Sequence, residues 1–151
     1  MVSMKLSYDK NKVSHDTLTY WESVLKLVGC AGQLRAKIAL RDNMRDESVS
    51  FRVEPVFNRY HGGSMSDLNR TIRNLQKYFF DLVEKINAVC VRHEVLQIKE
   101  PAKLLDLLQE KERRNYYNRE AKKLLSQNKL VPLQSLEKKY VKKKQQGQAK
   151  A

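Results

Sequence analysis

Turn-forming residues are scarce in this chain of 151 residues, which contains five glycines and three prolines. A β protein with many tight turns needs more of both, because Gly reaches positive φ angles and Pro presets the geometry of a turn. The shortage argues against a sandwich or barrel of short strands and predicts an all-α fold. The length is sufficient for one domain with its own hydrophobic core.

Cysteine and histidine are also rare. The two cysteines offer no disulfide framework, and we expect both to be buried thiols in a reducing compartment. A zinc site needs four converging ligands, whereas the soft ligands here are scattered without paired spacing: His15, Cys30, His61, Cys90 and His93. The sequence therefore predicts neither a metal site nor another cofactor.

Long apolar runs are missing too. A helix that spans a bilayer needs about 20 apolar residues in succession, and no stretch of the sequence approaches that length. Residues 1–13 are polar, so we expect a mobile N-terminus. They also lack the apolar region of a secretory signal. These features predict an intracellular protein with no membrane partner.

Acidic residues are outnumbered by basic ones. The chain has 30 Lys and Arg against 17 Asp and Glu, a net charge of +13. The surplus is uneven, because residues 99–151 hold 15 basic and six acidic residues, a net of +9. Such a concentration of charge indicates a polyanionic partner: nucleic acid, an anionic membrane or an acidic protein surface.

The first predicted helix runs from about His15 to about Met44, after an N-cap at Ser14 or Asp16. Four small residues at positions 29–32 interrupt it and favour a close helix crossing. Its apolar residues form two adjacent stripes, so its broad face should pack against more than one neighbour. One stripe comprises Leu18, Trp21, Leu25 and Val28, and the other comprises Tyr20, Val24, Leu27, Ala31, Leu34 and Ile38.

Residues 42–63 break the helical pattern. Val49, Phe51 and Val53 alternate with polar residues, which predicts a short extended segment that ends near Pro55. The segment is longer than the 2–8 residues or so that usually connect helices in a bundle. It is therefore either a functional loop or, as we predict, a strap that packs its apolar side chains across the helices.

The second predicted helix, from Asp67 to Ile98, has the clearest periodicity. Its apolar residues alternate between spacings of four and three, which is the heptad pattern of a helix packed along its length. An antiparallel hairpin with the first helix is the simplest arrangement. Apolar surface left over on the hairpin predicts an interface for a third helix, a second copy or another protein. The core and interface residues are Trp21, Leu25, Val28, Leu68, Ile72, Leu75, Phe79, Leu82, Ile86 and Val89, with His93 and Leu96 extending the seam.

A third helix is predicted from Pro101, where the first helical turn tolerates the missing N–H, to about Asn128. After Pro132, the residues Leu133, Leu136 and Tyr140 predict a short last helix that fades into a disordered end. We therefore divide the chain into a mobile N-terminus (1–13), a helical domain (14–128) with a strap loop (42–63), and a basic C-terminal tail (129–151).

The stretch His61-Gly62-Gly63-Ser64 resembles an oxyanion loop at first sight. An esterase of that type also needs the nucleophile motif G-x-S-x-G between a strand and a helix. The sequence here lacks the closing glycine of the motif, and no strand–helix alternation surrounds it. Two glycines that reverse the chain and a serine that caps the next helix explain these residues better. We predict a turn, although the capped helix N-terminus also suits a phosphate group.

Other catalytic arrangements are weak. Cys90 and His93 lie three apart on one helical face, which suits a thiolate–imidazole pair, but nothing nearby orients His93. Glu110, Glu112 and Glu120 alternate with basic residues, as solvated helices commonly do. The sequence predicts a protein that is not an enzyme.

The basic segment is the remaining candidate site. Cations neutralise phosphates, and exposed tyrosines stack on unpaired bases. The alternative is a solvated helix whose tyrosines pack inward, although adjacent tyrosines point about 100° apart and we expect at most one in the core. A membrane-surface helix is disfavoured, because residues 109–123 have too few apolar residues. The candidate nucleic-acid-binding residues are Arg113, Arg114, Tyr116, Tyr117, Arg119, Lys122, Lys123, Lys138, Lys139, Lys142, Lys143 and Lys144.

Two functions remain open. In the first, the chain is an adaptor or structural subunit of a larger nucleoprotein complex, with a protein partner on the seam and RNA or DNA on the basic arm. In the second, it is a stand-alone nucleic-acid-binding protein without sequence preference, as a monomer or a homodimer. In a eukaryote the lysine cluster at 138–144 would also serve as a nuclear import signal.

Overall fold

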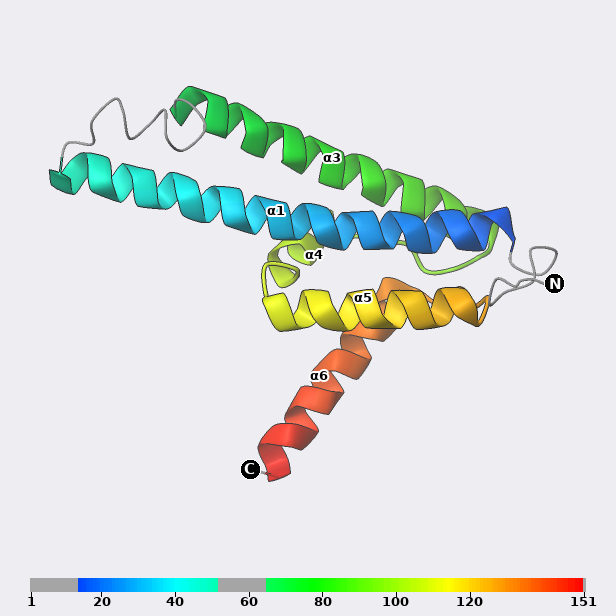
Figure 1. Ribbon diagram of the computed structural model, residues 1–151. Helices are drawn as coiled ribbons and strands as arrows, with labels where there is room; N and C mark the ends of the chain where they lie inside the picture. Colours follow the sequence, from blue (N-terminus) through cyan, green and yellow to red (C-terminus); the bar gives the residue numbers. More distant parts are fainter. Residues whose placement is uncertain (1–13, 52–64, 151) are drawn as a thin grey trace.

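The computed structural model describes residues 14–51 and 65–150, and every structural statement below concerns these residues. They form five helices and no strand: α1 His15–Phe51, α3 Met65–Arg92, α4 Pro101–Leu107, α5 Lys111–Ser126 and α6 Leu133–Lys150. The predicted all-α fold with a long hairpin is confirmed (Figure 1). The expectations for residues 1–13 and 52–64, including the turn at His61-Gly62-Gly63-Ser64, lie outside the described residues.

The hairpin consists of α1 and α3, which lie antiparallel and side by side (Figure 1). At one end, Asp16 near the start of α1 accepts a hydrogen bond of 2.7 Å from Arg92 at the end of α3. At the other end, the Arg41 guanidinium donates to the side-chain oxygen of Asn69 at 3.4 Å. Contacts at both ends require that the two helices run in opposite directions.

The heptad seam faces the interior of this chain. Leu75 is partly buried, and the other six seam residues from Leu68 to Val89 are buried. Trp21 and Val28 of α1 are buried in the same core, and Leu25 packs at its edge. Because α1 covers the seam, its described side chains belong to the core of this chain and are not open to a partner.

The first helix begins as predicted and ends later. The Ser14 hydroxyl accepts a hydrogen bond of 3.0 Å from the Thr17 amide, which makes Ser14 the N-cap. The predicted end at Met44 is wrong, because α1 continues to Phe51. The predicted extended segment at 49–51 is therefore helical. The chain has no Gly or Pro between Gly32 and Pro55 that would stop the helix earlier.

The second helix ends earlier than predicted, at Arg92 in place of Ile98. Glu94 adopts a positive φ of 55°, and the chain turns back along α3. The Asn87 side chain holds this return, because its amide donates to the Ile98 carbonyl at 3.0 Å and its oxygen accepts from the Ile98 amide at 2.7 Å. As a result Leu96 leaves the seam and is 50% exposed.

The predicted third helix is divided into α4 and α5. The break falls at residues 108–110, where the Arg114 guanidinium donates hydrogen bonds to the carbonyls of Leu108 at 3.0 Å and Gln109 at 2.8 Å. These bonds satisfy carbonyls that a helix end leaves without partners. The side chain of Leu108 is fully buried at the break.

The broad face of α1 has two neighbours, as predicted, with α3 on one side and α5 on the other (Figure 1). Near its start, α1 meets the connection after α5, because Tyr20 donates to the Val131 carbonyl at 2.8 Å. Further along, a Cβ added at Gly32 would lie 3.3 Å from the Arg114 side chain, whereas one at Gly29 would meet nothing within 4 Å. The close crossing predicted for the small residues is therefore made at Gly32.

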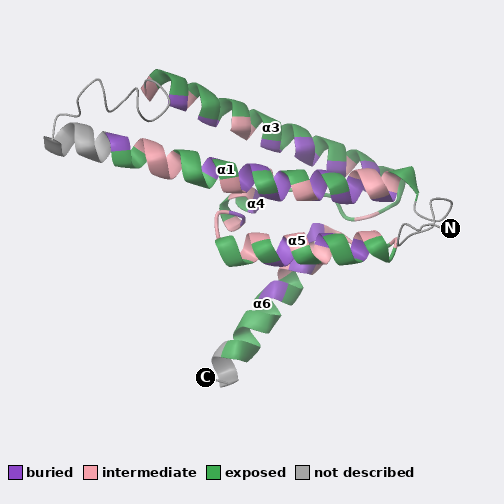
Figure 2. Ribbon diagram, in the orientation of Figure 1, coloured by how far each residue is buried: buried purple, intermediate pink, exposed green. Residues whose placement is uncertain are grey.

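The last helix, α6, is longer than predicted. Leu133, Leu136 and Tyr140 are buried against the body, whereas the described side chains after Tyr140 are exposed. The helix continues to Lys150, where a disordered end was expected. Figure 2 shows its exposed second half projecting away from the other helices.

Candidate nucleic-acid interface

The two tyrosines of the basic segment are both buried, contrary to the expectation that at most one would be. Tyr117 is 1% exposed and donates a hydrogen bond of 2.9 Å to Glu137 of α6. Tyr116 is 6% exposed and packs against the ring of Tyr140, with ring centroids 5.4 Å apart. Both of these contacts are made with α6, so the packing of the last helix on α5 helps to enclose the two adjacent rings. Neither ring is available for base stacking in this structure.

Arg113 is committed to contacts within the protein. Its guanidinium donates two hydrogen bonds of 2.9 Å to the two oxygens of Glu137 and one of 2.8 Å to Glu110. It also lies 4.6 Å from the centroid of the Tyr140 ring. The paired geometry holds α5 and α6 together, because a planar guanidinium matches both carboxylate oxygens at once.

Lys144 is likewise paired. Its ammonium lies 2.9 Å from Glu110 and 3.7 Å from Glu112, and Tyr140 donates a second hydrogen bond to Glu110. The hydrogen bonds from Tyr140 and Lys144 lower the pKa of the Glu110 carboxyl. Together with the two carbonyl contacts of Arg114 described above, these pairs remove three of the predicted cations from the set available to a partner.

The other predicted cations remain exposed. They come from two helices: Arg119, Lys122 and Lys123 of α5, and Lys138, Lys139, Lys142 and Lys143 of α6. Within the part of the chain that the structure describes, no ion pair joins these side chains to a carboxylate. Arg119 and Lys143 approach the ring of Tyr116, at 5.6 and 6.0 Å from its centroid. The Tyr116 ring therefore brings cations from the two helices to one place.

The thiol and imidazole candidates are occupied elsewhere. The His93 Nε2 atom lies 2.7 Å from the carboxylate of Asp16, which Arg92 also contacts. Cys90 is buried, and burial raises the pKa of its thiol, which disfavours the nucleophilic thiolate. Over the described residues, no three of the His, Cys, Asp and Glu side chains form a group suited to a metal ion. None of the described helices is long and apolar enough to cross a membrane.

Of the acidic partners of the basic segment, Glu110 was expected to pair with neighbouring basic residues, whereas Glu137 was not identified from the sequence. Glu110 and Glu137 decide which cations are paired, and they lie three and 24 residues from Arg113, respectively. The spacing of three between Glu110 and Arg113 is a signal of helical pairing, but the pair with Glu137 depends on how α6 packs.

Comparisons of this chain with protein-family models, with curated proteins and with solved structures find no match.

Proposed function

We propose that this chain is a non-enzymatic helical protein that binds the phosphates of RNA or DNA and acts as a subunit of a larger nucleoprotein complex. The observation that carries the proposal is the set of seven exposed cations on α5 and α6 that have no carboxylate partner among the described residues. Lysine and arginine that neutralise phosphates release counterions, and this release supplies most of the affinity that does not depend on sequence.

The shape of α6 supports phosphate contacts more than base readout. Its second half projects from the body (Figure 2). The successive lysines at 142, 143 and 144 are about 100° apart around the helix, so they lie on different sides of it. The tyrosines that would stack on bases are buried. We therefore propose electrostatic contacts along a nucleic-acid backbone, without selection of a sequence.

The test is fluorescence anisotropy of the full chain with a single-stranded RNA and a duplex DNA at several salt concentrations. The test variant replaces Lys138, Lys139, Lys142 and Lys143 with Gln. A matched control replaces four exposed cations of α1 and α3, namely Lys26, Arg35, Lys37 and Lys85, so that both variants lose the same charge.

The expected result is a loss of affinity of at least tenfold for the α6 variant, with little change for the control. On duplex DNA the slope of log affinity against log salt should fall by about 0.9 for each phosphate contact removed. Equal losses in the two variants would mean that net charge alone attracts the polymer. Unchanged binding in the α6 variant would overturn the proposal.

A protein partner is the other half of the proposal, and it cannot rest on the seam that α1 covers. Large apolar side chains remain exposed elsewhere, as on α3, where Tyr78 is 44% and Val91 is 61% exposed. The alternative is a protein that binds nucleic acid on its own, either as a single chain or as a homodimer. Light scattering on the isolated chain separates them, because a stable, monodisperse species favours the alternative and aggregation cured by a co-expressed partner favours the subunit.

A further inference from the structure

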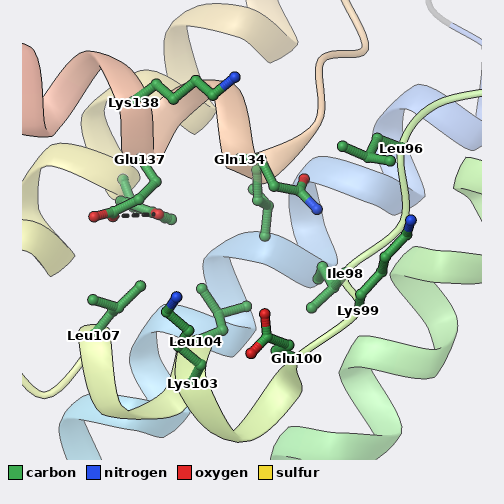
Figure 3. Close-up of a pocket in the computed structure, with 12 residues that line it drawn as sticks. Leu96, Ile98, Lys99, Glu100, Lys103, Leu104, Leu107, Gln134, Glu137 and Lys138 are labelled. Atoms are coloured by element: carbon green, nitrogen blue, oxygen red, sulfur yellow. Dashed lines mark hydrogen bonds between the residues drawn. The ribbon is translucent and has the colours of Figure 1, made fainter.

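A cavity of about 440 Å³ lies between α4, the segment at residues 96–100 and the start of α6 (Figure 3). This volume falls in the range of roughly 300–1,000 Å³ that small-molecule sites occupy. No part of the proposed nucleic-acid contact explains it, because a phosphate backbone does not fill a half-open, largely apolar cavity. Half of its lining residues are apolar: Leu96, Ile98, Leu104, Leu107, Tyr117 and Leu133.

The charged residues of the lining include more cations than anions. Glu137 is already neutralised by Arg113 at 2.9 Å, which leaves Glu100 as the other carboxylate of the lining. The lining also contains three exposed lysines: Lys99, Lys103 and Lys138. None of them forms an ion pair with a described residue. In Figure 3 the Lys103 ammonium points from α4 toward the cavity, and Lys138 extends over the outer side of α6.

We infer that this cavity binds a small amphipathic anion, with an apolar chain in the cavity and a carboxylate at its mouth. Apolar walls favour a ligand that brings little polar surface with it. A lysine ammonium at the edge pairs with a carboxylate in a charge-assisted hydrogen bond, and Lys103, whose ammonium points toward the cavity, is placed to do so. This inference stands apart from the proposed function, with Lys138 as the one cation common to both.

The experiment is isothermal titration calorimetry of the full chain with decanoate below its micelle concentration. We expect one saturable site per chain. Hexanoate should bind at least tenfold more weakly, because each methylene placed in an apolar site adds affinity. Nonyltrimethylammonium, which has the same nine-carbon tail and the opposite charge, should show no saturable binding.

Two variants locate the site. Lys99→Gln with Lys103→Gln should weaken decanoate binding about five- to tenfold. The matched control, Lys142→Gln with Lys143→Gln, removes the same charge from the exposed half of α6 and should leave the affinity unchanged. Leu107→Trp should fill the cavity and reduce binding more than tenfold, with circular dichroism and thermal unfolding used to verify the fold.

Methyl NMR of the leucine and isoleucine side chains gives an independent map. Chemical-shift changes on adding decanoate should centre on Leu96, Ile98, Leu104 and Leu133, which line the cavity from three segments. Changes spread over the protein would indicate adsorption to its basic surface and would overturn the inference. So would the absence of saturable binding, or a loss in the Lys142 and Lys143 control as large as that in the Lys99 and Lys103 variant.

Discussion

The indole nitrogen of Trp21 donates a hydrogen bond of 2.7 Å to the backbone carbonyl of Lys129, which lies 108 residues further along the chain. The contact joins the first helix to the connection between α5 and α6. Its neighbour Tyr20 does the same at the Val131 carbonyl, 2.8 Å away. These two buried side chains therefore anchor the whole C-terminal half, including the basic arm, to the hairpin.

Trp21→Phe should lower the free energy of unfolding by about 2–4 kcal/mol, because it removes the donor to the Lys129 carbonyl and leaves a gap in the core. Tyr20→Phe removes a hydroxyl and little volume, so a loss of about 1 kcal/mol is expected. Urea denaturation measures both. The control is Tyr78→Phe, which changes an exposed ring and should stay within about 0.5 kcal/mol of the parent. A Trp21→Phe variant as stable as the parent would contradict the anchoring role.

Arg113→Lys should destabilise the protein by about 1–2 kcal/mol, because an ammonium cannot match both oxygens of Glu137 as the guanidinium does. Arg119→Lys is the matched control on the same helix. Arg119 is exposed and lacks an ion pair among the described residues, so its exchange should change stability by less than about 0.5 kcal/mol. Thermal and urea unfolding distinguish the two variants, and equal stabilities would show that the pair with Glu137 contributes nothing.

The periodicity of the sequence predicted the hairpin and predicted that α1 packs against two neighbours, because the apolar spacing indicates which face of a helix is buried. The stop expected near Asn128 agrees with the end of α5 at Ser126, but the ends of α1, α3 and α4 were not predicted. The end of α3 at Arg92 depends on the Asn87 side chain, which holds the Ile98 backbone 11 residues away. The break after α4 depends on Arg114 in the next helix. Both are side-chain contacts that helix propensity does not contain.

The basic segment was located from its charge, but the sequence could not sort its cations. Arg113 is paired because α6 brings Glu137 to it from 24 residues away. Tyr116 and Tyr117 are both buried where α6 packs on them through Tyr140 and Glu137, which the angle between adjacent residues does not reveal. The free cations emerge only after these pairs are subtracted, so the tertiary packing defines the proposed interface.

The ion pair at the open end of the hairpin should make stability depend on pH. Hydrogen bonds from Arg92 and then from His93 hold the pKa of the Asp16 carboxyl well below its usual value of 3.8. A group whose pKa is lower in the folded state stabilises the protein above the unfolded value, and this contribution is lost as the pH falls. Asp16→Asn should therefore melt at a lower temperature than the parent at pH 7.

The difference in melting temperature between Asp16→Asn and the parent should shrink as the pH falls below about 3.8, when the carboxylate of the unfolded parent becomes protonated. Asp42→Asn serves as the control, because Asp42 is more exposed and has a single contact of 3.9 Å with Arg41. Thermal unfolding at pH 7, 4 and 2.5 makes the comparison. A difference that stays constant with pH would show that the effect of Asp16→Asn does not come from its charge.

The two glycines of α1 should respond differently to the same substitution. An alanine in the interior of a helix is favoured over glycine by about 1 kcal/mol, because it loses less backbone entropy. At Gly29 the added methyl group meets no atom within 4 Å, so Gly29→Ala should raise the free energy of unfolding by about 0.5–1 kcal/mol. At Gly32 the methyl would lie 3.3 Å from the Nε atom of Arg114.

The guanidinium of Arg114 can yield only by weakening its hydrogen bonds to the Leu108 and Gln109 carbonyls at the end of α4. Gly32→Ala should therefore gain less than Gly29→Ala or lose stability, since the strain offsets the gain in helix propensity. Urea denaturation of both variants gives the comparison. In the background of Arg114→Ala, where the obstruction is gone, Gly32→Ala should recover the full stabilisation seen at Gly29. Equal gains for the two glycines in the parent protein would contradict a close crossing between α1 and α5 at this point.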